Sequence, residues 1–232
     1  MGKSPTALVS GAAGGIGRAL AEGFLAAGYE VTGIDRAPEA WTAPGFAYVA
    51  LDVTDSAAVA AFGAGFEQLD VLVNAAGIIR RVAEFEVETF EEVVDVNLTG
   101  TMRLCTACRR ALAKRGGAIL NIASMLSFFG GGLVPAYSAS KGGIVTLTKS
   151  LAIAWARDDI RVNAIAPGWI ATPLTAALRE DEARSRAILE RTPMARWGTP
   201  EDLVGPALFL AGDAARFVTG AVLPVDGGYA SM

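Results

Sequence analysis

The chain has 232 residues, of which 52% are hydrophobic and only 19% are charged, and its formal net charge is −4. This length predicts one domain with a substantial core, and the acidic balance argues against nucleic acid and anionic membranes as partners. The chain contains no histidine, which excludes Ser-His-Asp catalysis, Cys-His catalysis and a zinc ion held by histidine.

The hydrophobic segments are short and interrupted. No clean apolar run reaches the roughly 18 residues that suggest a membrane-spanning helix. The first residues, M-G-K-S-P-T, lack the apolar core of a signal peptide. We therefore expect a cytoplasmic protein.

The first predicted unit is a strand, a glycine turn and a helix. The apolar run from Thr6 to Ser10 precedes G-A-A-G-G-I-G, and a helical pattern follows that stops at Gly28. Gly11, Gly15 and Gly17 would allow a tight turn, close approach to a pyrophosphate and close packing of the helix on the strand. The helix N-terminus would offer N–H groups to the phosphates, so this unit predicts dinucleotide binding.

The second predicted strand ends at Asp35. A carboxylate at this place would accept hydrogen bonds from the ribose diol of NAD and would repel the 2′-phosphate of NADP. Arg36 follows directly and could pair with that phosphate, although a solvent-exposed loop cation is the simpler interpretation. We therefore expect NAD, with NADP as the less favoured cofactor.

Later strands continue the same alternation. A third strand ends at Asp52 and Val53, which predicts an adenine contact, and a fourth runs from Asp70 into a turn of small residues at Gly77. Strands that alternate with helices indicate right-handed βαβ units and a parallel sheet, with ligands outside the carboxyl ends of the strands. The expected fold is α/β: a doubly wound Rossmann-type sheet of seven mainly parallel strands, with helices on both faces, in one domain over residues 1–232.

The segment from Ser124 to Lys141 carries the clearest candidate for chemistry. If a helix begins near Pro135, Tyr137 and Lys141 share one helical face. A nearby cation favours the phenolate and lowers the pKa of a phenol from its ordinary value of about 10, so that the group can act as acid or base. Ser124, which ends an apolar strand, could hold the oxygen that exchanges the proton. The alternative is a surface pair at chance spacing.

Three further features have ordinary interpretations. Asn97 opens the helix that carries Cys105 and Cys108, and it could simply be an N-cap. The two cysteines belong to an apolar stripe at helical spacing, so we expect core residues rather than a redox pair. The charged segment from Leu174 to Thr192 predicts helices that form a mobile lid.

These motifs, in this order, resemble the short-chain dehydrogenase/reductase family over essentially the whole chain. The matching motifs are S-G-A-A-G-G-I-G from Ser10 to Gly17, N-A-A-G from Asn74 to Gly77, Asn97, Ser124 with Y-S-A-S-K from Tyr137 to Lys141, P-G at Pro167, and the terminal D-G-G. The resemblance implies that Tyr137 is the acid/base, Ser124 polarises the carbonyl and Asn97 holds a water in a proton relay. Lys141 would bind the nicotinamide ribose and lower the Tyr137 pKa.

The resemblance also implies a set of cofactor contacts that follows the carboxyl ends of the strands. They are Ser10, Gly11, Gly15, Ile16, Gly17, Asp35, Arg36, Asp52, Val53, Asn74, Ala75, Gly77, Tyr137, Lys141, Pro167, Gly168, Ile170 and Thr172.

A narrower resemblance points to the branch of the family that acts on sugar acids. It rests on A-G-I-I-R-R, N-I-A-S-M-L-S-F and R-W-G-T-P-E-D-L. A guanidinium from Arg80 or Arg81 could pair with a substrate carboxylate, and the alternative is two solvated loop arginines. Met125, Phe128 and Trp169 would add apolar walls to a substrate site, or belong to the core.

The expected function is reversible, NAD-dependent oxidation of a secondary alcohol to a ketone on a small sugar acid, with no metal required. The alternatives are a reductase of another carbonyl, such as a 3-oxoacyl thioester or a neutral sugar or polyol, and a dinucleotide-binding regulator that has lost catalysis. Two long helices, beginning near Asn97 and Tyr137, carry apolar residues on more than one face. We therefore expect a homotetramer with two-fold axes.

Overall fold

The computed structural model describes residues 4–38 and 41–231. Its centre is a seven-stranded sheet in the order β3-β2-β1-β4-β5-β6-β7, and every neighbouring pair is parallel. The strands are β1 (Thr6–Ser10), β2 (Glu30–Asp35), β3 (Phe46–Ala50), β4 (Val71–Asn74), β5 (Ala118–Ile122), β6 (Arg161–Pro167) and β7 (Val222–Val225). The predicted Rossmann-type α/β sheet is therefore confirmed. The strand order reverses between β1 and β4, which is where such sheets form a ligand crevice.

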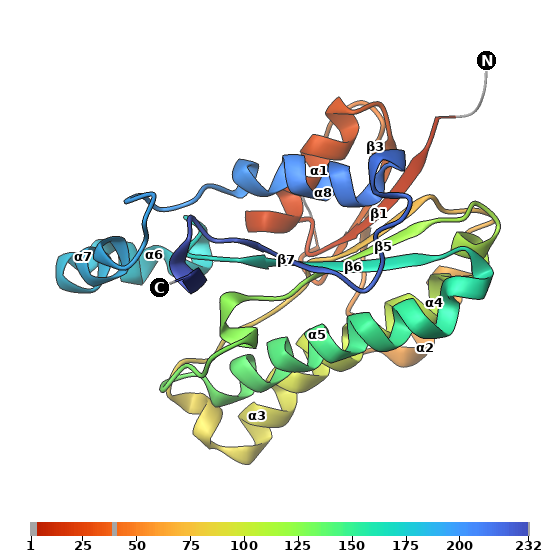
Figure 1. Cartoon of the computed structure of the whole chain (residues 1–232). Helices are drawn as coiled ribbons and strands as arrows, with labels where there is room; N and C mark the ends of the chain where they lie inside the picture. Colours follow the sequence, from red (N-terminus) through yellow and green to blue (C-terminus); the bar gives the residue numbers. More distant parts are fainter. Residues whose placement is uncertain (1–3, 39–40, 232) are drawn as a thin grey trace.

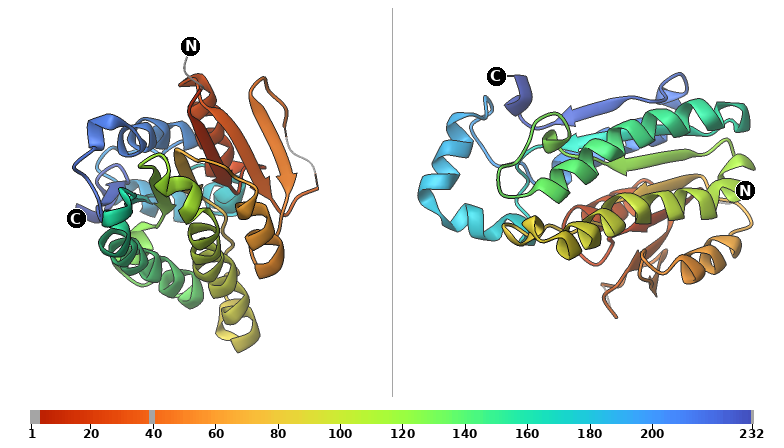
Figure 2. Two further views of the ribbon diagram at one scale, coloured as in Figure 1. Left: turned by 90° about the vertical axis from the view of Figure 1, so that its right-hand side faces the viewer. Right: turned by 90° about the horizontal axis from the view of Figure 1, so that it is seen from below.

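Helices cover both faces of the sheet (Figure 1; Figure 2). One face packs against α2 (Ser56–Ala64), α4 (Gly100–Ala113) and α5 (Pro135–Trp155), and the other packs against α1 (Gly15–Ala26) and α8 (Val204–Ala211). The remaining helices are α3 (Val87–Val94), α6 (Ala176–Glu180) and α7 (Glu182–Glu190). In Figure 1, α6 and α7 project beyond the sheet on the left, where they extend from the carboxyl end of β6.

The strands are apolar on both faces, as a sheet buried between two helical layers requires. Side chains alternate along each strand, so Leu8 and Leu72 pack with α4 and α5, whereas Val9 and Val73 pack with α1 and α8. This alternation divides the core into two layers. Three strands end in a polar residue, because Ser10 ends β1, Asp35 ends β2 and Asn74 ends β4.

Local signals explain where several helices begin and end. Asp55 caps α2, because its carboxylate accepts hydrogen bonds from the N–H groups of Ala57 and Ala58 at 3.0 and 2.9 Å. Pro135 occupies the first turn of α5, where a missing N–H costs nothing. Gly28, with φ of +87°, follows the end of α1. The strand, turn and helix order predicted for these segments is confirmed.

The start of the cysteine-bearing helix was predicted wrongly. Asn97 does not cap it, because α3 begins at Val87 and continues through one π-helical turn (Asp95–Thr99) into α4. The helical pattern of F-E-E-V-V simply runs on through the asparagine. A π turn inside a helix often marks a functional position, and here it carries the Asn97 side chain into the protein interior.

The cysteines are core residues, as predicted. Cys105 and Cys108 are free and buried in α4, and burial raises the pKa of each thiol to about 12. The charged segment from Leu174 to Thr192 forms α6 and α7 as expected, and its mobility stays a prediction. Within the part of the chain that is described, no helix combines the length and the apolar character needed to cross a membrane.

The glycine turn gives a direct test of helix packing on β1. A Cβ on Gly17 would overlap the carbonyl oxygen of Gly11 and lie 2.6 Å from its carbonyl carbon. We expect Gly17→Ala to lower the unfolding free energy by about 1–3 kcal/mol, measured by urea denaturation without cofactor. Gly14→Ala is the control, because among the described atoms nothing lies within 4 Å of the added Cβ. Equal stability of the two variants would contradict this packing.

Candidate active site

Three polar residues lie side by side where β1, β4 and β5 end. Ser10 is in register with Asn74, and Asn74 is in register with Asn121. The Ser10 hydroxyl accepts hydrogen bonds from the N–H groups of Ala75 and Ala76 at 3.1 and 3.2 Å, and Asn74 Nδ2 donates to Asn121 Oδ1 at 2.8 Å. Ser10 and Asn74, both predicted as cofactor contacts, are buried in the structure. They shape the turn that follows β4.

That turn and the glycine turn line a cavity of about 390 Å³. Its walls include many of the predicted cofactor contacts, namely Gly11, Gly15, Ile16, Gly17, Asp35, Arg36, Asp52, Val53, Ala75, Gly77 and Thr172. They also include residues that were not predicted as cofactor contacts: Gly14, Ile34, Leu51, Ala76, Ile78, Val96, Pro173 and Leu174. Most of these residues are adjacent in sequence to a predicted contact, and this adjacency is the sequence feature that could have identified them.

One end of the cavity is acidic. Asp35 ends β2, and its carboxylate accepts hydrogen bonds from the N–H groups of Ala13 and Ala37, both at 3.2 Å. Asp52 accepts from the N–H and the hydroxyl of Thr54 at 2.9 and 2.8 Å, and these bonds lower its pKa, the backbone one most. Arg36 is exposed beside them. Asp35, Arg36 and Asp52 therefore share the wall at this end of the cavity.

The other end of the cavity approaches Lys141. A Cβ on Gly77 would lie 3.3 Å from Asn97 Oδ1 and 3.7 Å from Lys141 Nζ, so only a glycine leaves this region open. Lys141 is 5% exposed, and its Nζ donates a hydrogen bond to the carbonyl oxygen of Ile122 at 2.6 Å. Burial lowers the pKa of its amine to about 8. The same Nζ lies 5.7 Å from the centre of the Tyr137 ring.

The predicted lowering of the Tyr137 pKa by Lys141 is not what the structure gives. Burial raises this pKa, Ser124 and then Arg81 lower it, and Glu84 raises it. Lys141 is not among the described groups that shift it. The physical reason is that burial disfavours both charged forms, the phenolate and the ammonium. The Lys141 amine is also held by the carbonyl of Ile122.

Ser124 is held in place by a short turn. It caps the 3₁₀ helix η3 (Met125–Ser127): its hydroxyl accepts a hydrogen bond from the N–H of Leu126 at 3.1 Å. Its own N–H donates to the Ser127 hydroxyl, which in turn donates to the carbonyl of Lys141 at 2.7 Å. The end of β5 is therefore tied to α5. Met125, predicted as a substrate wall, is buried in this turn, while Phe128 is half exposed.

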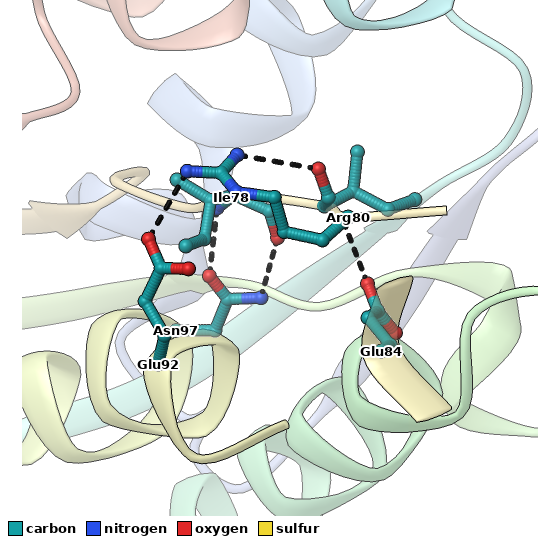
Figure 3. Close-up of polar contacts among 6 residues, drawn as sticks. Ile78, Arg80, Glu84, Glu92 and Asn97 are labelled. Atoms are coloured by element: carbon teal, nitrogen blue, oxygen red, sulfur yellow. Dashed lines mark hydrogen bonds and ion pairs between the residues drawn. The ribbon is translucent and has the colours of Figure 1, made fainter. Parts of the chain in front are cut away.

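Asn97 joins the loop after β4 to α5. Its Oδ1 accepts a hydrogen bond from the N–H of Ile78 at 2.8 Å, and its Nδ2 donates to the carbonyl of the same residue at 3.0 Å (Figure 3). Nδ2 also contacts the Ser140 hydroxyl at 3.1 Å, and Ser140 donates to the carbonyl of Tyr137 at 2.8 Å. The amide therefore links the backbone of the loop after β4 to the first turns of α5.

The two candidate arginines differ in their surroundings. Arg80 forms an ion pair with Glu92 of α3 at 3.1 Å (Figure 3). Arg81 reaches toward the carbonyl of Leu174 at 3.5 Å, beside α6, and its charge lowers the pKa of Tyr137. Of the two arginines, Arg81 is therefore the one whose charge bears on the candidate acid/base.

The segment after β6 contributes three residues to the wall of the main cavity. Among the described residues of this segment, Thr172, Pro173 and Leu174 line the cavity. Pro167, Gly168 and Ile170, which were predicted as cofactor contacts, precede these lining residues in the chain and are not part of the wall. Trp169 packs edge-on against Trp197 and Tyr229, with ring centres 5.9 and 6.2 Å apart. It faces a second cavity of about 180 Å³, and its buried indole N–H has no partner among the described atoms.

Comparison with known proteins gives the chain its family. A family model described as enoyl-(acyl carrier protein) reductase matches residues 11–230. The 2-dehydro-3-deoxy-D-gluconate 5-dehydrogenase of Dickeya dadantii is 42% identical over 96% of this chain and 94% of its own length. The galactitol 2-dehydrogenase (L-tagatose-forming) of Cereibacter sphaeroides is 40% identical over 96% of this chain and 94% of its own length.

Solved structures agree. The gluconate 5-dehydrogenase of Burkholderia cenocepacia, in complex with NADP and tartrate, superimposes with a TM-score of 0.92 at 37% identity, over 98% of this chain and 96% of that one. The chain therefore belongs to the short-chain dehydrogenase/reductase family, as an NAD(P)-dependent oxidoreductase that acts on CH–OH groups.

Proposed function

We propose that the protein interconverts a secondary alcohol and a ketone on a small sugar acid such as 2-dehydro-3-deoxy-D-gluconate, with NAD as its cofactor. The observation that carries this proposal is the place of Arg81. Its side chain reaches the carbonyl of Leu174, which lines the main cavity, and its positive charge lowers the pKa of Tyr137. A substrate carboxylate paired with Arg81 would therefore place a sugar hydroxyl on the Tyr137 side of the cavity. A relative that acts on such a sugar acid is 42% identical.

The main cavity fits a nicotinamide dinucleotide. Bare backbone lines it, because a Cβ on Gly11 would lie 2.8 Å from the carbonyl carbon of Ala75 and the φ of +72° at Gly11 also favours glycine. The N-terminus of α1 begins at Gly15 on the same wall, where N–H groups suit phosphates. When bound, the cofactor supplies the hydride chemistry at nicotinamide C4.

Side chains of the protein then transfer the proton and stabilise the reacting oxygen. In alcohol oxidation Tyr137 accepts the hydroxyl proton, and in ketone reduction it returns the proton to the oxygen. Ser124 donates a hydrogen bond to the same oxygen and stabilises the charge that develops there. Lys141, at the Gly77 end of the cavity, would hold the ribose next to the nicotinamide. Asn97 holds the Ile78 backbone and would hold a water in the proton relay.

NAD is the proposed cofactor because Asp35 is part of the cavity wall. Its carboxylate can accept hydrogen bonds from a ribose diol and repels a 2′-phosphate. Arg36 lies on the same wall and is exposed. The structure from Burkholderia cenocepacia contains NADP, which keeps NADP as the alternative.

A neutral polyol is the second candidate substrate. The observation that favours it is the 40% identity to a galactitol 2-dehydrogenase. A homotetramer stays a prediction. It is supported by apolar side chains that are uncovered in the single chain, with Ile153 of α5 81% exposed and Phe217, which follows α8, fully exposed.

Removal of the Tyr137 hydroxyl distinguishes the proposed enzyme from a dinucleotide-binding regulator without catalytic activity. We expect Tyr137→Phe to lower kcat by about 10²- to 10⁴-fold, because it removes the acid/base group. Binding of reduced cofactor, followed by nicotinamide fluorescence, should remain within a few-fold. Turnover at the wild-type rate would show that Tyr137 does not move the proton.

Neutral variants of the two arginines test carboxylate recognition. Arg81→Gln should lower kcat/KM on a sugar acid by about ten- to a hundred-fold, which is typical of a hydrogen bond to a charged group. The loss on a matched neutral polyol should be much smaller. Arg80→Gln is the control, because it removes a half-exposed pair with Glu92 and a long hydrogen bond to the carbonyl of Ile79. The assignment fails if both substrates lose equally, or if Arg80→Gln shows the acid-specific loss.

A further inference from the structure

Glu84 is a buried carboxylate that the reaction described above does not use. It lies in the 3₁₀ helix η1 (Ala83–Phe85), is 1% exposed and forms no ion pair with any described residue. A buried carboxylate is costly unless its oxygens receive hydrogen bonds. Here Oε1 accepts from the N–H of Arg80 at 2.8 Å (Figure 3), and Oε2 accepts from the N–H of Tyr137 at 2.9 Å.

The first contact fixes the loop that carries Arg81. Glu84 also donates its own N–H to the carbonyl of Arg80 at 3.0 Å, so the loop closes on itself. Between these points Val82 has a φ of +68°, a conformation that is strained for a β-branched residue. Its N–H is held by the carbonyl of Leu133 at 2.9 Å. Such strain persists only where surrounding contacts determine the backbone, so Arg81 sits in a tightly defined loop.

The second contact fixes the start of α5. Tyr137 lies in the first turn of this helix, where N–H groups lack partners within the helix and where the helix dipole favours a negative charge. Within the described structure, the N-cap residue Val134 provides no side-chain cap. Glu84, 53 residues earlier in the chain, takes that place.

We propose that Glu84 is a positioning residue that joins the Arg81 loop to the Tyr137 end of α5, so that carboxylate recognition and proton transfer form one rigid unit. This inference rests on the proposed function for the role of Arg81. Its link to Tyr137 rests on geometry alone.

The charges around the Tyr137 phenol predict a change in its pKa when Glu84 is neutralised. A residue that only stabilised the fold would not cause this change. Arg81 lowers the pKa of Tyr137 and Glu84 raises it. Lys141 lies further along α5 and is held by the carbonyl of Ile122, while Glu86 and Glu88 at the start of α3 are exposed. Removing the Glu84 charge should therefore let the phenol ionise at a lower pH.

The test is Glu84→Gln in the full chain. An amide keeps the shape but offers one oxygen and one N–H₂ group to two N–H donors, so one contact becomes repulsive. We expect kcat/KM on a sugar acid to fall by about ten- to a hundred-fold. We also expect the tyrosinate ultraviolet titration of Tyr137, isolated by subtracting that of Tyr137→Phe, to shift to lower pH. Glu86→Gln removes the same charge two residues away and should behave as wild type.

A second variant separates charge from geometry. Glu84→Asp keeps the charge but is one methylene shorter, so Tyr137 should titrate as in wild type while kcat/KM falls. This variant carries the test if Glu84→Gln does not fold. Wild-type titration and wild-type kinetics in Glu84→Gln would overturn the inference. Failure of both variants to fold would also overturn it, because Glu84 would then be purely structural. The titration needs no substrate, so a wrong substrate assignment leaves its outcome intact.

Discussion

The hydrogen bond from Lys141 Nζ to the carbonyl of Ile122, at 2.6 Å, is the contact on which the site depends. An amine can remain buried only where it has a polar partner, and this partner is the last residue of β5. The bond sets α5 against the carboxyl edge of the sheet. It therefore determines where Tyr137, one turn earlier, lies relative to Ser124. The bond from Ser127 to the Lys141 carbonyl holds the same junction from the other side.

Opposing effects act on the pKa of the Tyr137 phenol. Burial and Glu84 raise its pKa, while Ser124 and Arg81 lower it. A tyrosine that stays protonated near neutrality is ready to donate a proton in ketone reduction, and it becomes a base for alcohol oxidation as pH rises. Since Arg81 is also the proposed carboxylate ligand, a substrate that pairs with it would reduce its lowering effect on Tyr137. In the proposed function, substrate recognition and the acidity of the phenol would thus be coupled through Arg81.

Local sequence patterns predicted the parts of this site that are formed by residues close together in the sequence. The glycine spacing from Gly11 to Gly17 and the interval between Tyr137 and Lys141 each specify a turn or a helical face. The contacts that sequence did not reveal join distant segments. Glu84 is one of several acidic residues in its region, and only the fold brings it to Tyr137. Asn97 resembles an N-cap because the π turn that positions it has no clear local signal.

The most direct test of the account is a comparison of initial rates with NAD and with NADP, on sugar acids and on neutral polyols matched in length and hydroxyl stereochemistry. The placement of Arg81 and Asp35 predicts that activity depends on the substrate carboxylate and is higher with NAD. Activity on the neutral polyols alone would contradict the sugar-acid assignment, although it would leave the chemistry of Ser124, Tyr137 and Lys141 in place. Activity with NADP alone would contradict the role proposed for Asp35.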